Sequence, residues 1–111
     1  EYRMNLKMKR QRRGHARILK ITGNITGQDA AKIHTRLQSL TKSHKGPVAV
    51  DLSETTFIDS HGLGVLIYIW KRLEDSQREL VFLNPAPFVR EMLASTKLDR
   101  VFKVASSVDE L

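Results

Sequence analysis

Residues 48–64 read VAVDLSETTFIDSHGLG and join one short apolar run to a second apolar run that begins with a serine. The first part, residues 48–52, is rich in β-branched residues and predicts a strand in the interior of a sheet. Residues 53–56 are polar and predict a loop. From Ser60 onward, apolar residues recur at helical spacing over three turns, at positions 63, 66, 67, 70 and 73. We therefore expect a helix that begins at Ser60.

Ser60 is the residue on which the functional interpretation depends. A helix start carries unpaired N–H groups and partial positive charge, so a hydroxyl there can hold an added phosphate. A serine at a helix start can also be a cap and nothing more. Asp59 is expected to act as the cap, and Gly62 and Gly64 are expected to let the helix approach the sheet or a partner closely. The residues alone leave both roles of Ser60 open.

Outward from this stretch, predicted strands and helices alternate along the chain. Residues 2–8 alternate apolar and polar side chains, which predicts a first strand whose basic face points outward. Residues 11–14 predict a turn, and residues 15–21 a second, antiparallel strand that Gly23 ends. Thr26 is expected to cap an amphipathic helix that carries Asp29 in its first turn. The inward side chains of that helix are expected to be Ala30, Ile33, Leu37 and Leu40.

The C-terminal part continues this alternation. Residues 80–83 and 101–104 predict two further strands. Asn84, Pro85 and Pro87 predict the start of another helix between them. Its inward side chains are expected to be Phe88, Met92 and Leu93, and Ser106 or Ser107 is expected to cap a last helix. The pattern predicts one α/β domain over residues 1–111, with helices packed on a mixed sheet.

Composition restricts the classes of function. The chain has 111 residues, of which 41% are hydrophobic and 28% charged, and it has no cysteine, which excludes disulfides and cysteine chemistry. No apolar run approaches the roughly 18 residues of a membrane span, and no signal peptide is evident, so we expect a cytoplasmic protein. The four histidines lack ligand spacing, so no metal site or cofactor is predicted. Ile58 stands where the nucleophile elbow of an esterase needs glycine, so Ser60 is not expected to be a catalytic residue of that kind.

The charge balance is strongly basic. Nineteen Lys and Arg against twelve Asp and Glu leave a net charge of +7. Five basic residues lie within seven positions: Lys7, Lys9, Arg10, Arg12 and Arg13. Such a cluster can contact nucleic acid, anionic lipid or an acidic protein face. It can equally be a solvated hairpin edge that discourages strand-to-strand aggregation.

The motifs Asp51-Leu52-Ser53, Phe57-Ile58-Asp59-Ser60 and Gly62-Leu63-Gly64 resemble the signature of the STAS domain family, named from sulphate transporters and anti-sigma-factor antagonists. The resemblance covers most of the chain, since the apolar helix, the next strand and the proline-opened helix follow in the order of the family. It implies a mixed sheet of four to five strands with about four helices packed on it.

The resemblance also implies a function. In the bacterial regulators of this family, the serine that corresponds to Ser60 is phosphorylated by a partner kinase, which is often also the anti-sigma factor that the unphosphorylated protein binds. A separate phosphatase removes the phosphate. The resemblance therefore implies a switch protein and not an enzyme, with Ser60 as phosphoacceptor. The motif residues expected to orient it or meet the partner are Asp51, Asp59, His61, Gly62 and Leu63.

Two other binding functions fit the same sequence. One is a scaffold or accessory subunit that is not phosphorylated, as in stressosome-like assemblies or lipid-transport ATPases. The other is an adaptor that contacts nucleic acid or a membrane surface through the basic N-terminal hairpin.

Overall fold

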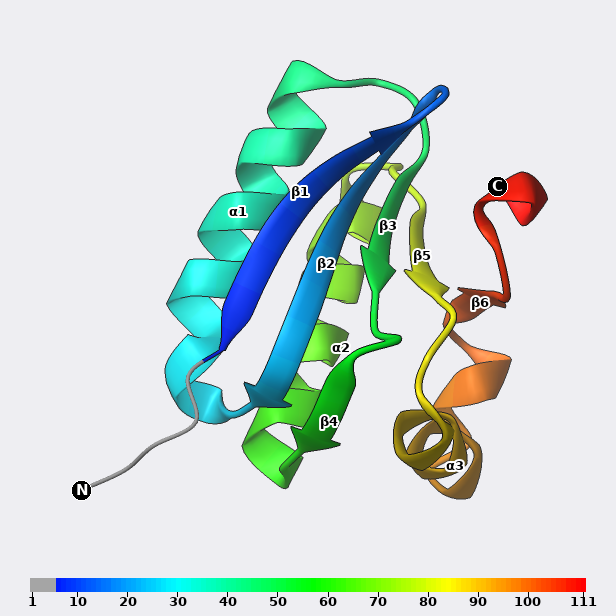
Figure 1. Cartoon of the computed structure of the whole chain (residues 1–111). Helices are drawn as coiled ribbons and strands as arrows, with labels where there is room; N and C mark the ends of the chain where they lie inside the picture. Colours follow the sequence, from blue (N-terminus) through cyan, green and yellow to red (C-terminus); the bar gives the residue numbers. More distant parts are fainter. Residues whose placement is uncertain (1–5) are drawn as a thin grey trace.

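A computed structural model describes residues 6–111, and these form one mixed sheet with helices against it (Figure 1). The strands along the sheet lie in the order β1-β2-β3-β5-β6, and a short strand, β4, pairs with the far end of β2. β1 is antiparallel to β2, and every other pairing is parallel. The bounds of the strands are β1 Lys7–Arg13, β2 Ala16–Ile25, β3 Val48–Asp51, β4 Thr55–Ile58, β5 Leu80–Leu83 and β6 Lys103–Ala105.

The first two strands form a hairpin with a turn shorter than predicted. β1 continues to Arg13, which pairs with Ala16, and Gly14 at φ 60° makes the turn. Met8 faces the helix side with Ile21, whereas Lys7 and Lys9 lie on the opposite face, as the alternation predicts. The part of the predicted first strand at positions 2–5 lies outside the described residues.

Gly23 does not end β2, so that prediction is wrong. The loop predicted over residues 53–56 is two residues too long, because Thr55 and Thr56 belong to β4. β2 runs on to Ile25, and its register shifts between Gly23 and Asn24. Gly23 has φ 104°, a conformation that glycine tolerates, and this irregularity lets β2 leave β3 and pair with β4. Strand β4 therefore leads directly to Asp59 and the helix that follows.

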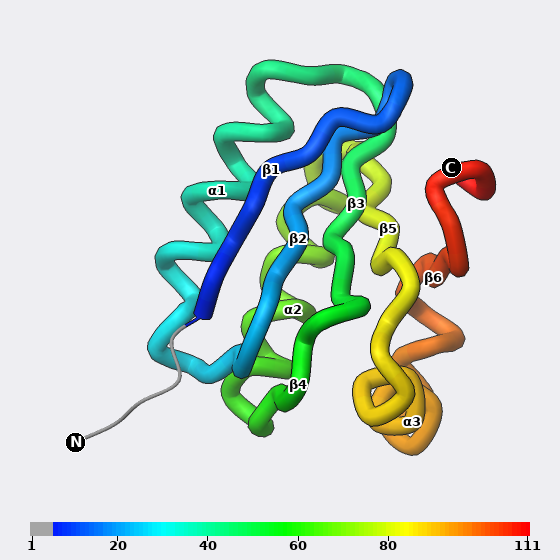
Figure 2. The backbone as a smooth tube through the Cα atoms, viewed as in Figure 1, coloured from blue at the N-terminus to red at the C-terminus, as the bar shows by residue number. Residues whose placement is uncertain are grey.

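Two long helices, α1 (Ala30–Ser43) and α2 (Ser60–Asp75), cover the same face of the sheet (Figures 1 and 2). A 3₁₀ turn at Gly27–Asp29 leads into α1. Thr26 caps this turn and so begins the helical segment, as expected. The inward side chains of α1 include Ile33, Leu37 and Leu40, and those of α2 include Val65, Leu66 and Ile69. They bury the main core against the sheet.

The C-terminal third completes the sheet and covers part of its other face. The helix α3 (Pro87–Ser95) turns Val89 and Leu93 inward, but Phe88 is exposed, in contrast to the prediction. After a 3₁₀ turn at Leu98–Arg100 and strand β6, a last 3₁₀ turn at Val108–Glu110 follows Ser107. Val108 and Leu111 pack on a second apolar cluster: Ile18, Ala49, Val81, Leu83 and Ala105.

The α/β fold class is thus confirmed. Within residues 6–111 the fold has β4 as an additional strand and three α-helices, the other helical segments there being 3₁₀ turns. Over residues 6–111, no helix has the length and apolar character needed to cross a membrane.

Candidate functional site

Ser60 is the first residue of α2 and lies immediately after β4. Asp59 is the N-cap: its backbone is extended, and its carboxylate Oδ1 accepts a hydrogen bond from the Gly62 amide at 2.6 Å. The cap is itself tied to the sheet, because the Asp59 amide donates to the Ile25 carbonyl at 3.3 Å. Since Asp59 does the capping, the Ser60 side chain is exposed at the helix start.

Gly62 explains why the motif needs a glycine two residues after the serine. A Cβ placed there would lie 2.1 Å from the Ile25 carbonyl oxygen, which belongs to the backbone. Gly62 therefore allows α2 to approach the end of β2 closely. Around Gly64 the space is open, so that glycine is not required for approach to the sheet.

His61 is exposed and lies beside the turn that precedes α1. A Cβ added to Gly27 would meet the His61 Cβ at 2.8 Å, so the two segments are in close contact. Together with Asp59 they border a shallow surface depression lined by Thr26, Gly27, Gln28, Asp59 and His61. The turn side of this depression is held by a capping box, in which the Thr26 amide donates to Asp29 Oδ2 at 2.8 Å.

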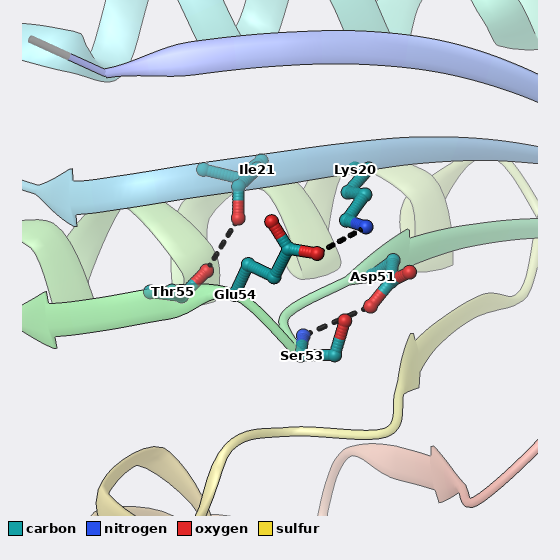
Figure 3. A network of polar contacts seen from close by, with 6 residues as sticks. All are labelled: Lys20, Ile21, Asp51, Ser53, Glu54 and Thr55. Atoms are coloured by element: carbon teal, nitrogen blue, oxygen red, sulfur yellow. Dashed lines mark hydrogen bonds and ion pairs between the residues drawn. The ribbon is translucent and has the colours of Figure 1, made fainter.

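Asp51 is the last residue of β3 and belongs to a different polar group, at the start of the loop between β3 and β4 (Figure 3). Its Oδ1 accepts a hydrogen bond from the Ser53 amide at 2.9 Å, which shapes the loop. In the same loop Glu54 pairs with Lys20 of β2 at 2.6 Å. The bond from Lys20 lowers the pKa of the Glu54 carboxyl and raises the pKa of the Lys20 amine. Asp51 therefore helps to shape the loop that leads to β4 and to Ser60.

The predicted site residues thus separate into three sets. Asp59, Ser60 and His61 lie together at the surface where α2 begins. Gly62 and Leu63 face inward, the first against β2 and the second partly buried against the core. Asp51 ends β3, directly before the loop that leads to β4.

Two aromatic residues near this surface were not expected to take part in it. Phe57 of β4 is 45% exposed, and Phe88 of α3 is 47% exposed. Their rings stack with centroids 5.7 Å apart and an interplanar angle of 24°. The exposure of Phe88 could not be recognised from the sequence, because its helical spacing grouped it with the inward residues of α3.

Among residues 6–111, no group of three or more His, Asp or Glu side chains is arranged to hold a metal ion.

The sequence matches the STAS domain family over residues 7–111. BtrV of Bordetella bronchiseptica, named as an anti-sigma factor antagonist, is 29% identical over 87 residues, which cover 78% of this chain and 75% of BtrV. An anti-sigma factor antagonist from Thermotoga maritima has a similar crystal structure, with TM-score 0.78 and 24% identity over 93% of this chain and 89% of that chain. The Bacillus cell fate determinant SpoIIAA in its phosphorylated form has the same fold, with TM-score 0.67 and 15% identity over 94% of this chain and 95% of that chain. The family match covers nearly the whole chain, and the protein therefore belongs to the STAS domain family.

Proposed function

We propose that this protein is an anti-sigma factor antagonist controlled by phosphorylation of Ser60. In its unmodified form it binds an anti-sigma factor that is also a serine kinase, through the surface where α2 begins. Phosphate transfer to Ser60 releases the partner, and a phosphatase restores binding. The observation that carries the proposal is the exposure of Ser60 at the first position of α2, beside a cap that leaves its hydroxyl available. The names of the relatives supply the class of partner.

The helix start is suited to hold a phosphate without unfolding. The Gly62 amide already donates its hydrogen bond to the Asp59 carboxylate. The amides of Ser60 and His61 have no acceptor within the helix. These groups and the positive end of the helix dipole favour an anion, each favourable terminal charge contributing about 0.3–1 kcal/mol. The phosphorylated form of SpoIIAA, which shares the fold, is a precedent for a folded phosphoprotein of this architecture.

Release follows from the charge that phosphate adds. A phosphoserine carries about −1.5 to −2 charges at neutral pH, and here it would stand next to the Asp59 carboxylate. A partner that covers this surface must then desolvate the added charge or repel it. We expect the loss of affinity to be about a hundredfold or more.

The stacked pair Phe57 and Phe88 supports a docking role for the same end of the molecule. Phe57 precedes Ser60 by three residues, and α3, which carries Phe88, packs against β4. Aromatic side chains are common anchors in protein interfaces. We expect Phe57→Ala to weaken partner binding at least tenfold. Its thermal midpoint should fall by only a few degrees, because Phe57 is 45% exposed and the change removes one stacked contact, with Phe88.

The test uses the purified protein, ATP with Mg²⁺, and each anti-sigma factor kinase of the source organism in turn. Mass spectrometry is expected to find one phosphate on Ser60, and Ser60→Ala is expected to abolish it. In calorimetric titrations Ser60→Asp should bind the partner about a hundredfold more weakly than wild type. Ser76→Asp, an exposed serine at the other end of the same helix, is the matched control and should bind as wild type does.

Equal affinities of wild type and Ser60→Asp would contradict the switch. Partner binding without any modification of Ser60 would instead favour a scaffold or accessory subunit of the same fold.

A further inference from the structure

The basic residues of the β1–β2 hairpin are gathered into a groove against the end of α1. The groove has a volume of about 230 Å³ and is lined by Arg10, Gln11, Arg12, Arg17, Leu40 and Ser43. It lies far from Ser60, because α1 runs back from the end of β2 toward the turn of the hairpin (Figure 1). We refer to it below as the arginine groove.

Three arginine side chains line the arginine groove because of strand register. Arg10 and Arg12 are two residues apart on β1, so both point to the side of the sheet that α1 covers. Arg12 is paired with Arg17 of β2, which adds a third cation on the same side. Exposed Lys42 and Lys45, at and just after the end of α1, extend the positive charge.

These arginines have no carboxylate partner within residues 6–111. The ion pairs there join Lys20 to Glu54, Lys71 to Asp75 and Lys103 to Glu79. Arg10 donates only to the Ser39 hydroxyl, at 3.5 Å, and Arg17 donates to the carbonyls of Gly14 and Ala16. Three like charges held close together repel one another, so an anion bound between them relieves that repulsion.

The end of α1 would ordinarily present free carbonyl groups and a partial negative charge, which disfavour an anion. Here Arg78 neutralises it, since its guanidinium donates to the carbonyls of Thr41, His44 and Gly46 at 3.0, 2.8 and 3.3 Å. The groove is thus bordered by a helix end at which the carbonyls of Thr41 and His44 are already bonded.

We propose that the arginine groove binds the phosphate backbone of a nucleic acid. Side chains two residues apart on a strand are about 6.6 Å apart, a spacing close to that of successive phosphates on an extended nucleic acid strand. Each guanidinium presents a planar fork that can bond two phosphate oxygens. The hairpin tip, Arg13, Gly14 and His15, offers no apolar side chain for insertion into lipid. Binding is independent of base sequence, because contacts to phosphate carry no sequence information.

The test is fluorescence anisotropy with a labelled single-stranded DNA and the matching duplex, at salt concentrations from about 50 to 200 mM. The groove variant combines Arg10→Gln, Arg12→Gln and Arg17→Gln. The matched control combines Arg90→Gln, Lys97→Gln and Arg100→Gln, three exposed cations on α3 and the turn after it. Both variants lose three positive charges, so the comparison separates the groove from net charge.

We expect the groove variant to bind at least tenfold more weakly and the control to stay within about threefold of wild type. The plot of log affinity against log salt concentration has a negative slope. In the groove variant this slope should be less steep by roughly two to three, as expected for three lost phosphate contacts. Equal losses in the two variants, or no binding by wild type at the lowest salt, would overturn the proposal. Sedimentation with anionic vesicles is run in parallel. Groove-dependent vesicle binding without DNA binding would also overturn it.

A third variant controls for folding. Arg10→Lys, Arg12→Lys and Arg17→Lys together keep the charge, and this protein should retain most of the affinity. Lysine lacks the planar fork, so a partial loss is expected. Because charge dominates sequence-independent binding to phosphate, a loss as complete as that of the glutamine variant would overturn the proposal. If the glutamine triple variant does not fold, Arg12→Gln alone is titrated against Arg100→Gln, with an expected loss of at least threefold for the former only.

Discussion

At the scale of single residues, two glycines two positions apart have opposite roles. Gly62 faces the backbone of β2, where the Ile25 carbonyl leaves no room for a methyl group. Gly64 faces open space on the exposed side of α2. In a motif where both look alike, only the first sets the position of Ser60.

Gly62→Ala should therefore destabilise the protein, whereas Gly64→Ala should stabilise it. The first change forces α2 away from β2 and should cost about 1–3 kcal/mol, as overpacking commonly does. The second removes a flexible residue from an exposed helix and should gain about 0.5–1 kcal/mol. Urea unfolding of both variants against wild type measures the two free energies. A gain in Gly62→Ala like that in Gly64→Ala would show that α2 does not approach β2 as closely as described.

Because of the ion pair between Lys20 and Glu54, the stability of the protein should depend on pH in the acidic range. Because the pKa of Glu54 is lowered in the folded state, its contribution is present above the ordinary pKa of 4.5 and is lost as the pH falls through the lowered value. The pKa of Lys20 is raised, so its contribution is lost only as the pH rises through a value above 10.5. At neutral pH both contributions are present.

Thermal unfolding of Glu54→Gln should accordingly show a small loss of stability at pH 7 that shrinks as the pH falls below 4.5 and is also smaller in high salt. Lys20→Gln should show the same loss at pH 7. The double variant should lose no more than either single one, since both remove the same interaction. Additive losses would mean that the two side chains act on stability separately.

At the scale of elements, β4 is what brings the serine to the end of the sheet. It is only four residues long, and its first residue, Thr55, is buried. The Thr55 hydroxyl donates to the Ile21 carbonyl at 2.8 Å, and the Gly23 amide donates to the Glu54 carbonyl at 3.1 Å. These two bonds join β4 to β2 where the register of β2 shifts.

Thr55→Val should lower the free energy of unfolding by about 1–3 kcal/mol, because it removes a buried hydrogen bond and leaves an apolar group against the carbonyl. Thr56→Val is the matched control. Thr56 is exposed and donates to the Asn24 side chain, so its loss should change stability by less than about 0.5 kcal/mol. Chemical denaturation gives both values, and equal effects would contradict the described pairing of β4 with β2.

At the scale of the whole molecule, the two proposed binding surfaces lie at opposite ends of the helix layer. α2 has 16 residues and is therefore about 24 Å long. Ser60 is at its start, while the arginine groove lies by the other end of the layer, where Arg78 joins the segment after α2 to the end of α1. Charges separated by more than about 8–10 Å in solvent are largely screened at physiological salt.

The two functions should therefore operate independently. Ser60→Asp is expected to leave the affinity for single-stranded DNA within about twofold of wild type at 0.15 M salt, because its charge is screened over this distance. Anisotropy titrations of the two proteins make the comparison. A change of tenfold would show instead that phosphorylation at one end controls binding at the other.

The residues that could be predicted from sequence are those whose structure is set by near neighbours. The start of α2 at Ser60, the cap at Asp59 and the capping of the first helical segment by Thr26 depend on contacts within a few positions, and the sequence patterns identified them. The apolar strands 48–51 and 80–83 were also evident, because a strand buried on both faces needs a continuous apolar run.

What the sequence by itself determined is thus the order of the main elements and the serine at the start of a helix. The tertiary structure alone decided that β2 continues past Gly23, that residues 55–58 form a strand and that Phe88 is exposed beside Phe57. It also decided that Arg10, Arg12 and Arg17 share one groove. Each of these features depends on pairing or packing between residues far apart in the chain. No local pattern encodes such pairing, because the partner strand or helix determines which side of a residue is covered.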